Sequence, residues 1–104
     1  MEAAVTAPVV NISVIRPKAG RLDDFMALQL EQHRRVRGKV DGLRGARLFR
    51  SDDGVVLISV FDSAEQADAF RRDPMFTDHI ARVRPLIETS EAGAFTQAYA
   101  VGEI

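Results

Sequence analysis

The chain has 104 residues, of which 46% are apolar and 28% are charged, and its formal net charge is -1. This length suits one domain with a single core, and the near-zero charge gives no electrostatic reason to expect nucleic acid or an anionic membrane as a partner. The absence of cysteine excludes disulfides, thiolate metal sites and a thiol nucleophile. It also agrees with a reducing compartment, so we expect a cytoplasmic protein.

Residues 1–8 predict a flexible tail without the basic start and apolar stretch of a signal peptide, which leaves residues 9–104 as one domain. The first strand is expected from about Val9 to Arg16, and it ends at the turn over residues 17–20. Alternation places apolar side chains on both of its faces. One face carries Val10, Ile12 and Val14, and the other carries Val9, Asn11, Ser13 and Ile15.

The first helix is expected from about Arg21 to Arg37, and it ends near Gly38. Gln29 and His33 project onto the middle of its apolar face. The other members of that face are Leu22, Phe25, Met26, Val36 and Val40. A second strand over about residues 46–51, a hairpin turn over residues 51–54 and a third strand over residues 55–61 follow.

Ser63 and Gln66 have the spacing of a capping box, which predicts the start of a second helix. Asp73 before Pro74 is a new N-cap with proline at the first helical position, so we expect this helix to break there. The restarted helix carries a buried stripe that contains Met75, Phe76, His79, Ile80 and Val83. A last strand is expected over about residues 94–101, where apolar and small residues alternate.

The resulting order, βαββαβ, predicts an α+β ferredoxin-like fold with a four-stranded antiparallel sheet. Two helices cover only one face of such a sheet, yet the first and third strands are apolar on both faces. The apolar area of an uncovered sheet face would exceed the area that monomers usually expose. We therefore expect a homodimer in which two sheets pack face to face and form a shared barrel.

Four segments carry a family resemblance: the turn at residues 17–20, residues 42–50 with the acidic turn after them, residues 60–67, and the step at residues 73–76. On these segments the chain resembles the antibiotic biosynthesis monooxygenase family, which consists of small dimeric α/β-barrel proteins. The resemblance implies a homodimer. It also implies oxidation of an aromatic, phenolic or quinone-like molecule by O₂ without a metal or flavin cofactor, as some relatives perform. Other relatives degrade haem or modify signalling molecules.

The haem-degrading branch of this family uses an Asn on the first strand and a Trp and a His on the second helix. In this chain those positions fall on Ser13, Phe70 and Ile80. None of the three residues matches, so the resemblance does not extend to haem degradation.

Five polar residues occupy positions where the pattern calls for apolar ones: Asn11, Ser13, Gln29, His33 and His79. If their strand face lies under the helices, they converge on one layer between sheet and helices. Buried polar groups are costly unless they are paired, so such a cluster indicates a polar network or a small-molecule pocket. The phenylalanines that would form the walls of a pocket for an aromatic ligand are Phe25, Phe61, Phe70 and Phe76.

For oxygenation without a cofactor, His33 or His79 is the candidate base, because imidazole titrates near neutral pH. Asn11 or Gln29 is the candidate holder of the oxyanion, with Ser13 beside them in the pocket. A metal site built on the two histidines lacks a carboxylate on the same face, so we expect none. Each polar residue also has a structural alternative, a core or interface position bonded to a neighbouring carbonyl.

Two functions from other classes stay open on the sequence. The first is a small-molecule binding protein without turnover. The second is an isomerase or lyase of the dimeric-barrel type that uses a histidine for proton transfer.

Overall fold

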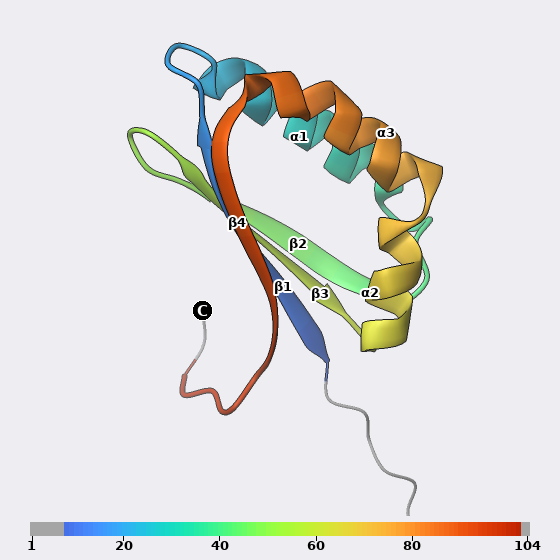
Figure 1. The fold of residues 1–104 in the computed structure, drawn as a ribbon. Helices are drawn as coiled ribbons and strands as arrows, with labels where there is room; N and C mark the ends of the chain where they lie inside the picture. Colours follow the sequence, from blue (N-terminus) through green and yellow to red (C-terminus); the bar gives the residue numbers. More distant parts are fainter. Residues whose placement is uncertain (1–7, 103–104) are drawn as a thin grey trace, which may run out of the picture.

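The computed structural model describes residues 8–102, so most of the predicted tail lies outside the described residues. The elements follow in the order β1 (Val9–Pro17), α1 (Leu22–Val36), β2 (Leu43–Arg50), β3 (Val55–Phe61), α2 (Ala64–Arg71), α3 (Pro74–Val83), a short 3-10 turn (Arg84–Leu86) and β4 (Ile87–Thr96). The strands form one antiparallel sheet in the order β2-β3-β1-β4. The predicted ferredoxin-like α+β class is confirmed (Figure 1).

The second predicted helix is broken where its sequence indicates. The Ser63 hydroxyl accepts a hydrogen bond from the Gln66 backbone N–H at 3.2 Å and caps α2. The Asp73 carboxylate accepts from the Met75 N–H at 2.8 Å and caps α3, with Pro74 in its first turn. The chain changes direction sharply between the two helices (Figure 1).

The expected last strand is wrong: β4 spans Ile87–Thr96 and not residues 94–101. It pairs with β1 from Val9–Thr96 to Pro17–Ile87, and the Lys18 N–H donates to the Leu86 carbonyl at 2.7 Å where β4 begins. β4 is an edge strand with a largely exposed, polar first half. Its hydrogen bonds to β1 hold it in the sheet, so it needs no apolar alternation of its own.

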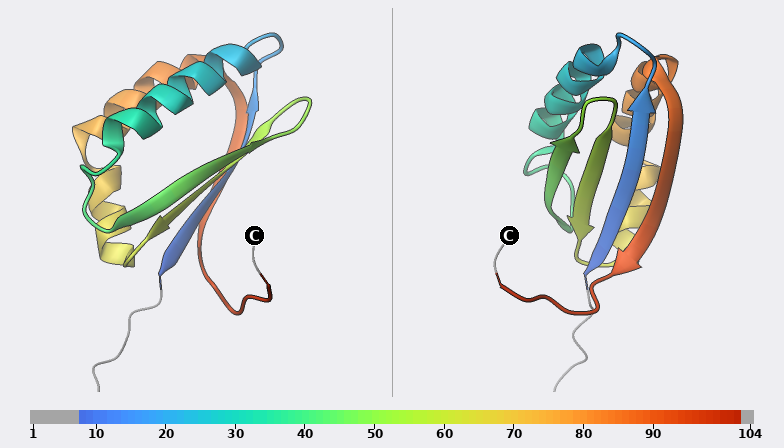
Figure 2. Two further views of the ribbon diagram at one scale, coloured as in Figure 1. Left: turned by 180° about the vertical axis from the view of Figure 1, so that it is seen from behind. Right: turned by 90° about the vertical axis from the view of Figure 1, so that its left-hand side faces the viewer.

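All helices lie on one face of the sheet (Figure 2). Val9 and Ile15 of β1 are buried on that side, as the alternation predicts, so Asn11 and Ser13 also face the helices. Phe25 and Val83 bring the helices into the same core. The opposite face is open and keeps large apolar side chains about half exposed, namely Val14 at 54%, Phe49 at 50% and Phe95 at 54%.

Gly42, the last residue before β2, lies against the first turn of α2. Its φ is +79°, and a Cβ at this position would collide with the Gln66 side chain. Its carbonyl accepts from the Asp62 N–H at 2.8 Å. The positive φ is the feature that requires glycine here, because the Gln66 amide is the far end of a flexible side chain and could move away from a Cβ.

Candidate active site

A cavity of about 130 Å³ lies between the sheet and the helices. Eight of the nine residues proposed from the sequence line it: Ser13, Phe25, Gln29, His33, Phe61, Phe70, Phe76 and His79. They come together because strand and helix periodicity send all of them to the same side. Asn11, the ninth, does not line this cavity.

A second, larger cavity of about 410 Å³ adjoins the first. Asn11 lies in this one, with Arg71 from the last turn of α2 and Ala92 and Ala94 from β4. The two cavities share the walls formed by Ser13, Leu57, Ser59, Phe61, Phe70 and Phe76. We call them the inner and the outer cavity.

The two histidines of the inner cavity are connected through one amide. Gln29 of α1 accepts at Oε1 from His79 Nε2 of α3 at 2.8 Å, and its Nε2 lies 3.1 Å from His33 Nε2. An amide oxygen only accepts and an amide nitrogen only donates. With this amide orientation, neutral His79 carries its proton on Nε2, and neutral His33 carries its proton on Nδ1.

Burial keeps both histidines neutral at ordinary pH. It lowers the pKa of His79 to about 4, and the positive charges of Arg82 and Arg35 act in the same direction, while Glu31 opposes them. Burial also lowers the pKa of His33. Neutral His79 then has an unprotonated Nδ1, and no residue in the described part of the chain forms a hydrogen bond with that atom.

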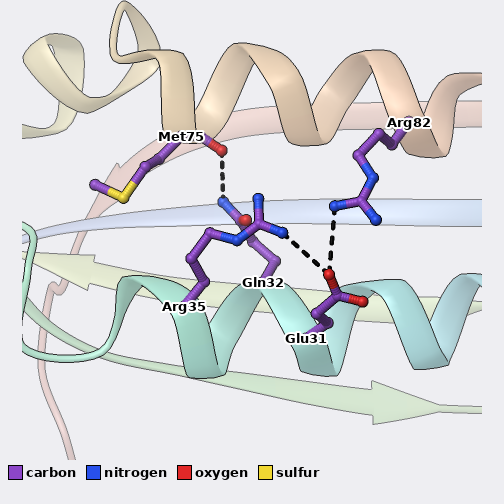
Figure 3. Close-up of polar contacts among 5 residues, drawn as sticks. All are labelled: Glu31, Gln32, Arg35, Met75 and Arg82. Atoms are coloured by element: carbon purple, nitrogen blue, oxygen red, sulfur yellow. Dashed lines mark hydrogen bonds and ion pairs between the residues drawn. The ribbon is translucent and has the colours of Figure 1, made fainter.

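Gln32 is a polar residue of the inner cavity that the sequence analysis missed. It is 4% exposed, and its Nε2 donates to the Met75 carbonyl at 2.9 Å across the gap to α3 (Figure 3). This bond fixes the orientation of the amide, and its Oε1 is buried without a hydrogen-bond partner in the described part of the chain. The signal was its position seven residues after buried Phe25, which places it on the same helix face.

A surface ion pair ties the two helices together beside this site. Glu31 of α1 accepts from Arg35 at 3.0 Å and from Arg82 of α3 at 3.4 Å (Figure 3). Since all three side chains are substantially exposed, the pair contributes little to stability. Its effect on the site is electrostatic, because Arg82 and Arg35 add to the effect of burial in lowering the pKa of His79, while Glu31 raises it.

Three aromatic rings form the shared wall of the two cavities. The ring centroid of Phe70 lies 5.9 Å from that of Phe61 and 5.3 Å from that of Phe76, the second pair edge to face. These are favourable geometries for aromatic packing. The three rings therefore give both cavities an apolar, polarisable surface, next to the hydroxyl groups of Ser13 and Ser59.

Asn11 has a hydrogen-bond partner outside the inner cavity. Its side-chain oxygen accepts from Arg71 Nη2 at 3.0 Å. The predicted layer of five polar residues is thus divided: Ser13, Gln29, His33 and His79 line the inner cavity, and Asn11 lines the outer one.

No group of three or more metal-ligating side chains gathers anywhere in residues 8–102. Over the same residues, no helix has the length and apolar character needed to cross a membrane.

Comparison with known proteins identifies the family. The sequence profile of a family described as antibiotic biosynthesis monooxygenase matches residues 8–82 of this chain. Among curated protein sequences, none matches. The fold is shared with many solved structures, among them the following two. The cofactor-independent oxygenase SnoaB from Streptomyces nogalater is 22% identical, with a TM-score of 0.82 and coverage of 93% of this chain and 99% of that one. A Mycobacterium tuberculosis protein is 21% identical, with a TM-score of 0.80 and coverage of 92% and 100%. The chain belongs to the antibiotic biosynthesis monooxygenase family.

Proposed function

We propose that this protein is a cofactor-independent monooxygenase that oxidises an electron-rich phenol or quinol with O₂. The observation that carries the proposal is the His79–Gln29–His33 chain in an aromatic-walled cavity, where both histidines are held neutral. Membership of the family and the fold shared with a cofactor-independent oxygenase support the same reaction class.

His79 is the proposed base. Its Nε2–H is committed to Gln29, so the lone pair on Nδ1 is the position that can take the phenolic proton. His33 is a poorer base, because a proton on its Nε2 would face the donating amide of Gln29. The low pKa of His79 rises once a phenolate forms next to it, since opposite charges stabilise each other in a poorly solvated cavity.

Gln32 is the proposed acceptor for a second hydroxyl group. Its buried Oε1 lacks a hydrogen bond among the described residues, and an unpaired buried carbonyl costs about 1–3 kcal/mol. A quinol hydroxyl that donates to this oxygen would remove the penalty and orient the ring. The three phenylalanine rings would pack against the quinol ring and fix the orientation of its plane.

The electrons for the reaction come from the substrate. Loss of the phenolic proton leaves an anion that can reduce O₂, after which one oxygen atom bonds to a ring carbon and the other leaves as water. The substrate loses two hydrogens in the process, so no external reductant is required. The protein contributes a base, an oriented site and the exclusion of water.

We also propose that the protein is a homodimer joined through the open sheet face. That face carries exposed Val14, Phe49 and Phe95, and a hollow of about 390 Å³ at the β2–β3 hairpin end. Packing it against a second copy would remove this apolar surface from water. The site lies on the other side of the sheet, so each subunit would keep its own cavities.

A small-molecule binding protein without turnover is the second candidate. The pKa of about 4 for His79 favours it, because such a group takes up a proton weakly at neutral pH.

Oxygen consumption separates the two candidates. Purified protein is incubated with naphthols, naphthohydroquinones and anthrones in an oxygen electrode, with and without a chelator. The proposal expects O₂ uptake equal to product formed, insensitive to the chelator and at least tenfold slower in His79→Leu. A thermal shift with the same compounds but no O₂ uptake above the uncatalysed rate would instead identify a binding protein.

A further inference from the structure

The outer cavity has one charged side chain among the described residues that line it, Arg71. The other lining residues are polar but neutral, or apolar. Within residues 8–102, Arg71 is therefore the one fixed charge that a ligand in this cavity would contact directly, and its field is reduced by the ion pair that it forms with Asp68.

Arg71 is held in place from two elements. Its Nη1 bonds the Asp68 carboxylate one turn earlier on α2, and its Nη2 donates to Asn11 Oδ1 on β1 at 3.0 Å. A guanidinium has five N–H donors, so three are left after these two bonds. The Asn11 amide nitrogen likewise has no hydrogen-bond partner in residues 8–102. Donors from two residues thus converge at the same edge.

Asp68 pairs with Arg71 but leaves its other donors available to the cavity. The Asp68 side chain is 54% exposed and is not among the lining residues. Both partners are partly exposed, Arg71 at 44%, so solvent screens the two charges to a similar degree, and the carboxylate orients Arg71 toward the strand. A ligand in the outer cavity meets the guanidinium and the Asn11 amide, and no carboxylate.

Small side chains on β4 create the space beside these donors. Ala92, Gly93 and Ala94 line the outer cavity where β4 passes beside β1, and none has a side chain larger than a methyl group. The volume of about 410 Å³ falls in the range of roughly 300–1,000 Å³ typical of ligand pockets.

The size of the ligand determines whether it occupies one cavity or both. The inner cavity, at about 130 Å³, is below that range, so a ring system with two or more fused rings must extend into the outer one. The two cavities adjoin along the rings of Phe61, Phe70 and Phe76, with the small polar side chains of Ser13 and Ser59 beside them. A ligand with its hydroxyl near His79 then has its far end near Arg71.

We infer that the substrate is a fused-ring phenol or quinol that carries a carboxylate at the end remote from the reacting hydroxyl, and that Arg71 binds this carboxylate. The inference rests on the proposed function for the aromatic class of the ligand. Arginine suits the role because its planar fork matches a carboxylate with two parallel hydrogen bonds. Asn11 serves as a positioning residue that holds the fork and adds a donor.

Binding of two matched probes, 6-hydroxy-2-naphthoate and 2-naphthol, tests the inference by calorimetry at neutral pH. Wild-type protein is expected to bind the carboxylate about three- to tenfold more tightly, because Arg71 is partly exposed and already paired with Asp68. Arg71→Gln is expected to remove this preference while leaving 2-naphthol binding within about twofold. Arg71→Lys should retain part of it, and Asn11→Ala should weaken it. Arg72→Gln, at the neighbouring exposed position, is the control and should change neither affinity.

Equal affinities of the wild type for the two probes would overturn the inference, as would failure of both to bind at millimolar concentration. An equal loss for both probes in Arg71→Gln, with Arg71→Lys behaving in the same way, would also overturn it, since Arg71 would then be structural. The proposed function fails separately: a carboxylate preference without O₂ uptake on any phenol or quinol leaves the anion site in place and removes the oxygenase.

Discussion

Gln29 Oε1 lies 2.8 Å from His79 Nε2, although the two residues are 50 positions apart in the chain. The bond joins α1 to α3 across the inner cavity and determines which nitrogen of His79 is free. The same bond therefore joins the two helices and fixes the tautomer of the proposed base.

Replacing Gln29 by Leu leaves His79 Nε2–H buried without an acceptor. We expect the free energy of unfolding to fall by about 1–3 kcal/mol, measured by urea denaturation at neutral pH. Nitrogen-15 NMR of the histidine rings provides a second readout. The wild type should show His79 protonated on Nε2 and His33 on Nδ1, and the variant should show mixed tautomers. The opposite tautomers in the wild type would mean that the Gln29 amide is turned around.

Replacing Gln32 by Leu should behave differently, although the residue is equally buried. The change removes one hydrogen bond, to the Met75 carbonyl, but also removes an unpaired buried oxygen. We expect unfolding free energy within about 1 kcal/mol of the wild type, together with weaker binding of quinols. A loss as large as that of Gln29→Leu would show that Oε1 has a partner, such as an ordered water.

Acidification should destabilise the protein through His79. Its pKa is about 4 in the folded protein against 6.5 when unfolded, so the unfolded chain binds more protons between these values. Stability from this residue is therefore complete above about pH 6.5 and is lost as the pH falls toward 4, by up to about 3 kcal/mol. In His79→Gln, the drop between about pH 7 and about pH 4.5 should be smaller by about 1–3 kcal/mol. Equal drops in both proteins would refute the lowered pKa.

A charge on the open sheet face should break the proposed dimer. Val14→Asp places a carboxylate among apolar side chains that the second copy would cover. Sedimentation velocity at micromolar concentration is expected to show a dimer for the wild type and a monomer for the variant. Leu30→Asp is the matched control, since Leu30 is similarly exposed, at 49%, but lies on α1. Loss of the dimer in the control alone would place the interface on the helices.

Gly42→Ala should be more costly than Gly38→Ala. Both residues have a positive φ, but only at position 42 would the new Cβ collide with a side chain, that of Gln66. The backbone penalty is about 1 kcal/mol in each variant, and position 42 adds a smaller cost because the Gln66 amide must move away from the Ser63 hydroxyl that donates to it. Melting temperatures of the two variants provide the comparison. In Gly42→Ala with Gln66→Ala, the cost should return to that of Gly38→Ala.

Most elements could be predicted because their signals are local. The bounds of β3 and the break before Pro74 follow from a β-branched run and from a proline with an Asp cap. β4 could not be placed, because an edge strand gains its stability from the neighbour it pairs with. The alternating residues after Thr96 matched the strand pattern without having a partner strand.

The sequence by itself determined the order of elements and the side to which each residue points, since both depend on local turn signals and on the periods of helix and strand. This was enough to predict eight residues of the inner cavity. Only the tertiary structure decided that Gln29 connects two histidines, that Gln32 Oε1 is unpaired and that Asn11 is bonded to Arg71. These contacts depend on how far apart α1, α2, α3 and β1 settle when their side chains pack, and no spacing along the chain encodes that distance.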